Sequence, residues 1–249
     1  LTENGYDTAY IGKWHLWANQ LGHHHDVENS YTPPGPDRLG FDGYWAAYNF
    51  HHEYVDAYYH TDSPEKITLK GYEPDGQTDL AIEQLRAAGD SQKPFAMFLS
   101  YGTPHDPWVP ENVPAAYLEA FNNVEFQLPP NYGASNDAHA DAWARLSDEE
   151  RAQITEWMRV TYAMTANLDW NIGRLLSAID ELGLREHTVL VFTSDHGELF
   201  GAHGRRAKNI FYDEAVRVPF LMRWPGHTSA GQESDVCLNT PDIMPTLLS

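Results

Sequence analysis

Apolar runs of strand length alternate with helical patterns along this chain. Residues 95–101 and 188–194 are continuous apolar runs, typical of strands that are buried on both faces of a sheet. Between them, apolar side chains recur at helical spacing over residues 147–182, behind a capping box formed by Ser147 and Glu150. Strands separated by helices predict an α/β fold with a mostly parallel central sheet and helices on both faces.

Weaker patterns complete the outline of the fold. Residues 8–13 and 216–224 predict two further strands, and residues 79–88 predict a helix that ends at Gly89. Residues from about 17 to 74 carry little periodicity and many turn formers, so we expect a His- and aromatic-rich insertion in one domain that spans residues 1–249. Both ends of the sequence fall inside predicted elements, so we expect a fold truncated at both ends.

The charge balance narrows the classes of function. The chain has 36 acidic and 16 basic residues, a net charge of −20 with His neutral, which disfavours nucleic-acid binding. An anionic substrate would therefore need a local cationic pocket. The single cysteine, Cys237, excludes an internal disulfide and a four-cysteine zinc site. No apolar run approaches the roughly 18 residues of a transmembrane segment.

Polar segments follow three of the predicted strands directly. They are Gly12-Lys13-Trp14-His15, Gly102-Thr103-Pro104-His105-Asp106 and Ser194-Asp195-His196-Gly197-Glu198. Ligands of open α/β sheets bind beyond the carboxyl ends of the strands. We therefore expect these segments to converge on one cleft, with their polar tips within roughly 10–12 Å of each other, the scale of a small-ligand pocket.

Each candidate residue also has a plainer interpretation. Asp195 and His196 form a metal half-site, or else a turn cap beside an exposed histidine. Lys13 and His15 alternate along a strand and so face one side, which suits an oxyanion, or else they form a charged strand end. His105, between two prolines, is otherwise a surface-loop histidine.

Two further features carry less information when taken alone. Lys208, which follows a glycine-rich turn, is by itself an ordinary surface lysine. The run His23-His24-His25 is more simply a loop tract than a metal cluster, because consecutive residues do not easily share one ion.

The order of the motifs carries a family resemblance over nearly the whole chain. Gly12-Lys13-Trp14-His15, Pro104-His105, Ser194-Asp195-His196-Gly197-Glu198, Gly201-Ala202-His203-Gly204, Lys208 and Trp224-Pro225-Gly226 follow one another. This pattern resembles the sulfatase family of the alkaline phosphatase superfamily, in particular bacterial arylsulfatase-like members. The resemblance implies an alkaline phosphatase-like fold and hydrolysis of sulfate monoesters, of small molecules or of glycans.

The resemblance also implies roles for individual residues. Asp195 and His196 match ligands of a divalent metal, which we expect to be Ca²⁺, with Mn²⁺ as the alternative. Lys13 and Lys208 match the lysines that hold the sulfate oxygens. His15 matches the histidine beside the nucleophile, and His105 the one that protonates the leaving oxygen. These roles suit the chemistry, which requires neutralised charge on the sulfate and a proton for the leaving group.

One family motif is missing from the sequence. Family members carry a Cys or Ser, oxidised to formylglycine, in a Cys/Ser-x-Pro-x-Arg motif, whereas Cys237 lies in Asp-Val-Cys-Leu. In the family that motif precedes Gly-Lys-Trp-His, so we expect it in an upstream segment. Residues 1–249 by themselves are then expected to be inactive towards sulfate esters.

Two alternatives stay open at this point. His196 stands where many sulfatases have Asn, which also fits a phosphonate or phosphate ester hydrolase of the same superfamily. A non-catalytic module that binds a sulfated ligand through Lys13 and Lys208 is the third interpretation. The sequence leaves the oligomeric state and the compartment open, with the bacterial periplasm or cytoplasm expected.

Overall fold

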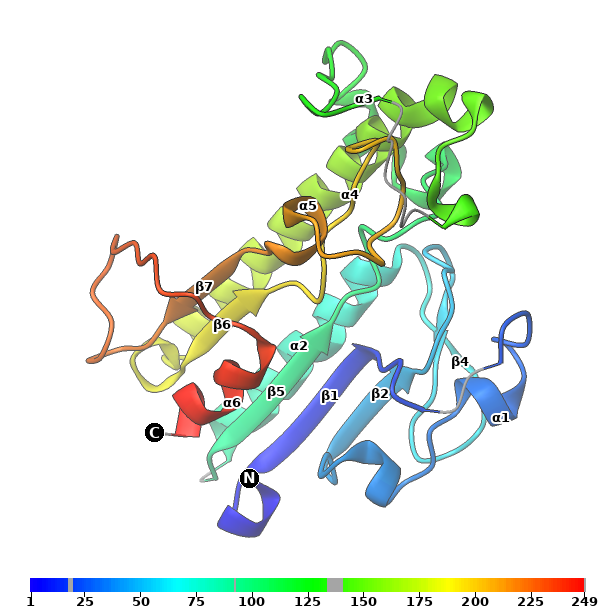
Figure 1. Cartoon of the computed structure of the whole chain (residues 1–249). Coiled ribbons are helices and arrows are strands. Elements are labelled where there is room, and N and C mark those ends of the chain that lie inside the picture. Colours follow the sequence, from blue (N-terminus) through cyan, green and yellow to red (C-terminus); the bar gives the residue numbers. More distant parts are fainter. Residues whose placement is uncertain (18–19, 92, 134–140, 249) are drawn as a thin grey trace.

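A three-stranded parallel sheet forms the centre of the computed structural model, which describes residues 1–17, 20–91, 93–133 and 141–248. Its strands are β1 (Asp7–Lys13), β2 (Tyr44–Tyr48) and β5 (Phe95–Ser100), in the order β2-β1-β5 (Figure 1). The register pairs Lys13 with Tyr48 and Gly12 with Ser100. The predicted α/β fold with a parallel sheet is therefore confirmed.

The strand β2 corrects the predicted outline. Residues 44–48 lie inside the segment that we expected to be an insertion, yet they pair in parallel with β1 along the whole of β2. The run Tyr-Trp-Ala-Ala-Tyr is short, and apolar and polar residues do not alternate along it, so the sequence carries no periodic signal for a strand. Four of its five residues are buried in the structure. The rest of the segment holds a small hairpin of β3 (Tyr58–Tyr59) and β4 (Ile67–Thr68).

The last two strands form a ladder of their own. β6 (Leu190–Thr193) and β7 (Phe220–Arg223) pair antiparallel, and in the described residues neither is hydrogen-bonded to the central sheet. Both elements were predicted as strands, over longer ranges. Val216, where the second of these strands was predicted to begin, is instead the last residue of the short helix α5 (Asp213–Val216).

Two long helices cover one face of the sheet. These are α2 (Glu73–Asp90) and α4 (Asp148–Glu181), which pack on each other and, through α2, on β1 and β5. The predicted capping box of α4 is present, with Ser147 and Glu150 bonding reciprocally. α2 begins at Glu73, earlier than the predicted start at residue 79. A proline such as Pro74 is favoured in the first turn of a helix, although in the sequence it suggests a turn. α2 also continues one residue past Gly89.

The two faces of the sheet bury different side chains. Ile11 and Ala46 point towards Ala81 of α2, in a small aliphatic cluster. On the opposite face Tyr10 packs with Trp14 and Trp45 in an aromatic cluster that loops rather than long helices cover. Because successive residues of a strand alternate, Lys13 lies on the α2 side of the sheet.

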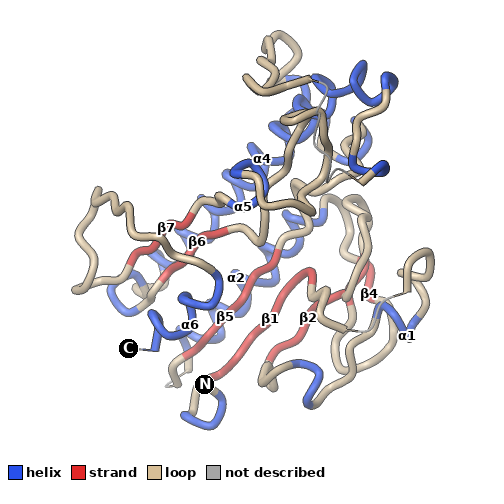
Figure 2. The backbone as a smooth tube through the Cα atoms, viewed as in Figure 1, coloured by secondary structure: helices blue, strands red, loops and turns tan. Residues whose placement is uncertain are grey.

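The remaining elements are short and lie mostly in the connections (Figure 2). They are the helices α1 (Val27–Ser30), α3 (Ala115–Glu119) and α6 (Thr240–Leu248), with 3-10 turns at Thr2–Asn4, Pro36–Arg38, Pro110–Asn112, Ala142–Ala144 and Arg185–His187. None of the described helices has the length and apolarity needed to cross a membrane.

Candidate functional site

The loops that follow β1, β5 and β6 carry all six predicted site residues and lie at the same end of the strands (Figure 1). Lys13 and His15 are at the end of β1, His105 is in the loop after β5, and Asp195, His196 and Lys208 follow β6. This placement is the one expected for parallel α/β sheets, whose loops at the carboxyl ends build binding sites.

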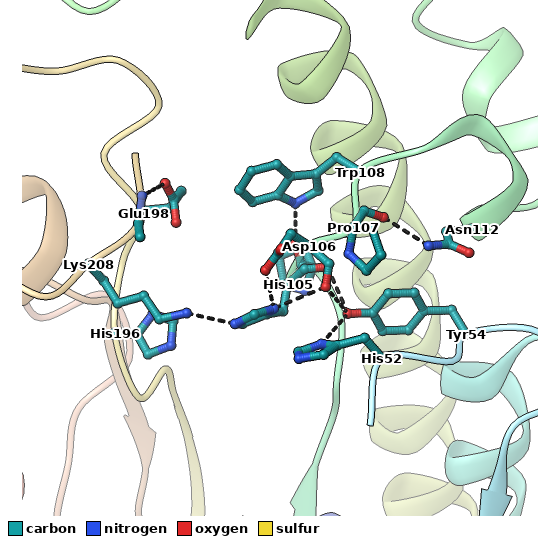
Figure 3. A network of polar contacts seen from close by, with 12 residues as sticks. His52, Tyr54, His105, Asp106, Pro107, Trp108, Asn112, His196, Glu198 and Lys208 are labelled. Atoms are coloured by element: carbon teal, nitrogen blue, oxygen red, sulfur yellow. Dashed lines mark hydrogen bonds and ion pairs between the residues drawn. The ribbon is translucent and has the colours of Figure 1, made fainter. Parts of the chain in front are cut away.

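His105 is held by a polar contact at each ring nitrogen, as Figure 3 shows. Its Nε2 lies 2.6 Å from Nζ of Lys208, and its Nδ1 lies 2.7 Å from Oδ1 of Asp106. An ammonium group can only donate, so Nε2 accepts from Lys208 while Nδ1–H donates to the carboxylate. This hydrogen bond also lowers the pKa of Asp106. The two partners therefore select one tautomer of His105.

The backbone around His105 is fixed by side chains from other elements. The buried Tyr54 hydroxyl bonds to the main-chain oxygens of His105 and Asp106, at 2.7 and 3.0 Å. Nε1 of Trp108 donates to the main-chain oxygen of Pro104 at 2.8 Å. Three carbonyl groups of the loop are thereby tied down, which limits the positions that the imidazole can take.

The ring of His52 stacks on the ring of His105. Their centroids are 4.4 Å apart and the planes are inclined by 23°. Burial, followed by the charges of His105 and Lys13, lowers the pKa of His52 to about 3. His52 is therefore neutral at ordinary pH and offers His105 an aromatic face that adds no competing charge.

Phe50 links Lys13 and His15. Nζ of Lys13 lies 5.2 Å above the centroid of the Phe50 ring, and the His15 ring lies 4.6 Å from it. His15 adopts a left-handed backbone (φ 52°), and its N–H donates to the main-chain oxygen of Asn49 at 2.7 Å. As the alternation of a strand predicts, Trp14 turns away into the aromatic cluster.

The charges of the β1 and β6 loops act on each other. Burial lowers the pKa of Lys13, Asp195 opposes that shift, and Lys208 adds to it. Burial also lowers the pKa of His15, and Lys13 and Lys208 add to this shift. Two ammonium groups that repel each other across a partly buried space bind an anion well, because the anion relieves the repulsion.

A half-buried glutamate shapes the turn that presents Lys208. Oε1 of Glu198 accepts the N–H of Ala207 at 2.6 Å, and Ala207 has a left-handed φ of 65°. Burial raises the pKa of Glu198, against the effects of that N–H and of Lys208. Glu198 therefore closes the loop between residues 198 and 207 and places Lys208 opposite His105.

Asp195 and His196 have the geometry of two adjacent metal ligands. Nδ1 of His196 lies 2.8 Å from the main-chain oxygen of Gly197, so Nδ1–H donates and the lone pair of Nε2 is available. This Nε2 lies 3.5 Å from Oδ2 of Asp195, whose side chain is 80% exposed. The pair suits one edge of a coordination shell. Across the described ranges, no group of three or more His, Cys, Asp or Glu side chains is placed to hold an ion.

One chain of contacts joins the six predicted residues. His105 touches Lys208 directly, and its ring lies 6.0 Å from that of His196. Phe50, which contacts Lys13 and His15, lies 4.8 Å from His52, the ring stacked on His105. The structure thus brings the predicted residues together, while the role of each in catalysis stays a prediction.

Four supporting residues had no assigned role in the sequence analysis. Asp106 carried a visible signal, because it follows His105 directly and stands between the same two prolines. Glu198 belongs to the quoted Asp-His-Gly segment. His52 and Tyr54 carry no local signal, since only the tertiary fold brings residues 52 and 54 to residue 105.

The fold and the site define a class: an α/β protein whose carboxyl-end loops present two lysines, several histidines and an adjacent Asp–His pair. The sulfatase family model matches residues 1–249. The chain therefore belongs to the sulfatase family of the alkaline phosphatase superfamily, as its motifs predicted.

Two characterised relatives cover almost the whole chain. An ulvan-active sulfatase of Formosa agariphila is 36% identical over 248 residues, which are 98% of this chain and 44% of that protein. An endo-4-O-sulfatase of Bacteroides thetaiotaomicron is 29% identical and matches 98% of this chain and 48% of its own length. The chain thus spans about half the length of these relatives.

Solved structures agree with this placement. One, from work on glycosaminoglycan metabolism by Bacteroides thetaiotaomicron, superposes with a TM-score of 0.82 at 26% identity and covers 99% of this chain and 51% of its own. Another, solved with its substrate D-glucosamine-2-N,6-O-disulfate, has a TM-score of 0.72 at 26% identity, over 92% of this chain and 55% of its own.

Proposed function

We propose that the protein is a sulfuric ester hydrolase that cleaves sulfate monoesters. Within it, the loops described above supply the anion-binding lysines and the proton-donating histidine. The observation that carries this proposal is the arrangement Asp106–His105–Lys208, in which a carboxylate orients an imidazole whose other nitrogen faces a cation. Membership of the sulfatase family supports it.

The first step is capture of the sulfate group. Lys13 and Lys208 neutralise the charge of the sulfate oxygens, in a pocket where partial burial strengthens that attraction. An incoming sulfate oxygen is a better acceptor for the Lys208 ammonium than a neutral imidazole nitrogen. Substrate binding therefore draws Lys208 from His105 and frees Nε2.

Proton transfer to the leaving group follows. His105 takes up a proton on the freed Nε2, and Asp106 stabilises the resulting imidazolium through Nδ1–H. As a nucleophile forms a new bond to sulfur and the S–O bond to the alcohol breaks, Nε2–H passes its proton to the departing oxygen, which leaves as the alcohol. His105 then returns to the neutral tautomer seen in the structure.

The sulfatase family implies a metal ion and formylglycine. Oδ2 of Asp195 and Nε2 of His196 would hold part of the shell of a divalent cation, Ca²⁺ or Mn²⁺. When bound, such an ion stabilises charge on the sulfate and lowers the pKa of a coordinated nucleophile. The family resemblance assigns His15 to the side of the nucleophile, and its contact with Phe50, over which Nζ of Lys13 also lies, supports a position beside the anion-binding lysine.

The substrate class that we propose is a sulfated carbohydrate. One relative, 28% identical over 311 residues, is an N-acetylglucosamine-6-O-sulfatase of Bacteroides thetaiotaomicron. The ulvan-active relative and the structure solved with a glucosamine disulfate support the same class. The rings of His15, Phe50 and His52 beside the lysines offer flat faces against which a sugar ring can pack.

A phosphonate or phosphate monoester is the second candidate substrate. His196 as a metal ligand favours it, and the fold of the phosphonate monoester hydrolase of Agrobacterium radiobacter is similar, with a TM-score of 0.56 at 20% identity. A module that binds sulfated ligands without turnover is the non-enzymatic candidate, which the same pocket of lysines would serve.

A paired assay separates these candidates. The protein expressed from its complete gene is tested on an aryl sulfate, a glucosamine 6-sulfate and a phosphonate monoester, with Ca²⁺ or Mn²⁺. We expect the two sulfate esters to be hydrolysed faster than the phosphonate. Lys208→Ala should remove most of that activity, while the exposed His187→Ala should not. Faster phosphonate cleavage would favour the second candidate, and binding without turnover would favour the non-enzymatic one.

A further inference from the structure

Glu73 is a buried carboxyl group that no step above uses. Its side chain is 1% exposed at the first residue of α2, and neither carboxyl oxygen forms a hydrogen bond of ordinary geometry within the described part of the chain. A carboxyl group buried beside the Tyr48 hydroxyl is costly to ionise, so a fold that keeps one invites a functional explanation.

The surroundings of Glu73 point to the anion pocket. The main chain at Gly102, at the end of β5, passes so close that an added Cβ would lie 2.5 Å from the Tyr48 hydroxyl and 3.0 Å from Oε2 of Glu73. Glycine at this position therefore leaves room for the carboxyl group directly behind the loop that carries His105. Tyr48 is also the β2 partner of Lys13 in the sheet register.

Lys13 is a cation on the same side of the sheet as Glu73. Both Lys13 and Tyr48 project from the sheet on the side of α2, where Glu73 begins the helix. The charges of Lys13 and Glu73 act on each other in both directions, each favouring the ionised form of its partner. Around Glu73 the other titratable groups are Tyr48 from β2, Glu53 and Tyr54 from the loop after β2, and Tyr72 next to it in the chain.

We propose that Glu73 is a positioning residue of the anion pocket, which acts through Lys13 as a counter-charge that depends on its own protonation. With Glu73 neutral, the Lys13 ammonium directs its whole charge at the bound anion. With Glu73 ionised, the carboxylate attracts the Lys13 ammonium and offsets its charge, so less of that charge acts on the bound anion. This inference rests on the proposed function only in so far as Lys13 binds the sulfate group.

The protonation of Glu73 changes within an accessible range. Burial raises its pKa from 4.5 to about 8, against the effects of the Tyr48 hydroxyl and of Lys13. Anion affinity should therefore fall as the pH passes through this range. Linkage requires the reverse effect as well, so that a bound anion raises the pKa of Glu73 by the same factor.

Calorimetric titration of the complete protein with inorganic sulfate tests the proposal. Affinity is measured at about pH 6.5 and about pH 9, on either side of the pKa of Glu73. Between these two pH values, the sulfate affinity of the wild type should fall about tenfold more than the sulfate affinity of Glu73→Gln. This difference corresponds to a coupling of one pKa unit between Glu73 and the bound anion, which is a factor of ten. Glu83→Gln, an exposed glutamate on the same helix, is the matched control and should behave like the wild type.

A double-mutant cycle shows whether Lys13 carries the effect. In a Lys13→Met background, Glu73→Gln should leave the pH dependence of sulfate affinity unchanged, because the group through which it acts is gone. Infrared spectroscopy gives the reciprocal readout. The carboxyl band of Glu73 is identified by its loss in Glu73→Gln, and in the wild type this band should titrate at a higher pH when sulfate is bound.

The outcomes that overturn the proposal are distinct from those that overturn the proposed function. An equal fall in affinity for the wild type and for Glu73→Gln would assign the pH dependence to other groups. Absence of sulfate binding in the wild type would also refute the inference. Sulfate binding with the expected pH pattern, but without hydrolysis of any sulfate ester, would count against the proposed function alone.

Discussion

Nζ of Lys208 and Nε2 of His105 lie 2.6 Å apart, although 103 residues separate them in the sequence. The loop after β5 and the connection between β6 and β7 therefore share one contact, in which the lysine donates and the histidine accepts. In the proposed reaction, an anion that draws Lys208 away would free Nε2 of His105.

Loss of His105 should affect substrates unequally. In the complete protein, His105→Ala should slow hydrolysis of alkyl or sugar sulfates by about 10²–10⁴-fold, the usual contribution of general acid catalysis. Aryl sulfates with good leaving groups need less proton donation and should lose far less. The measurement is a leaving-group series of kcat/KM, with His187→Ala as control. Equal losses along the series would assign His105 to substrate positioning.

Asp106 should matter through His105 alone. Asp106→Asn removes the carboxylate 2.7 Å from Nδ1 and with it the stabilisation of the imidazolium. We expect kcat to fall about 10–100-fold, as for other residues that orient a functional side chain, with KM little changed. The loss should be much smaller in a His105→Ala background, and additive losses in the double variant would show that Asp106 acts independently.

Removal of Tyr54's hydroxyl should loosen the loop that carries His105. Tyr54→Phe deletes the hydrogen bonds to the main-chain oxygens of His105 and Asp106 and leaves the buried ring in place. A cost of about 1–3 kcal/mol in the free energy of unfolding is expected for carbonyls left without their partner. Chemical denaturation measures this cost. Tyr162→Phe, on an exposed part of α4, provides the control and should change stability little.

Metal affinity should depend on Asp195. Asp195→Asn keeps the shape of the side chain but removes the charge, so Ca²⁺ or Mn²⁺ affinity should fall at least tenfold in calorimetric titrations. Asp213→Asn, whose side chain is exposed at the start of α5, is the matched control. Unchanged affinity in Asp195→Asn would remove Asp195 from the proposed set of ligands.

Stability should fall with rising pH because of Glu73. Its pKa is about 8 in the folded protein, against an ordinary 4.5, so between these values the folded state keeps a proton that the unfolded state has lost. The free energy of unfolding must then decrease as the pH rises through this window, by about 2–4 kcal/mol. Glu73→Gln should flatten that slope in melting curves from about pH 5 to pH 8, and Glu83→Gln should not.

The sequence by itself determined the elements whose signals are local. The apolar runs of β1, β5 and β6, the capping box of α4 and the polar residues at strand ends all depend on near neighbours, and each prediction held with small shifts in bounds. The motif order was enough to indicate the family. Lys13, His105 and Asp195 could be selected because strand ends are where parallel sheets place ligands, whereas Lys208 could be selected only through the family resemblance.

Only the tertiary structure decided what supports those residues. β2 carries no periodic signal and joins the sheet because β1 offers it a partner edge and an aromatic cluster to pack on. His52 and Glu73 become meaningful only when the fold sets one against His105 and the other behind Lys13. Stacking, burial and the resulting pKa shifts depend on contacts between residues far apart in the chain, and no local pattern encodes such contacts.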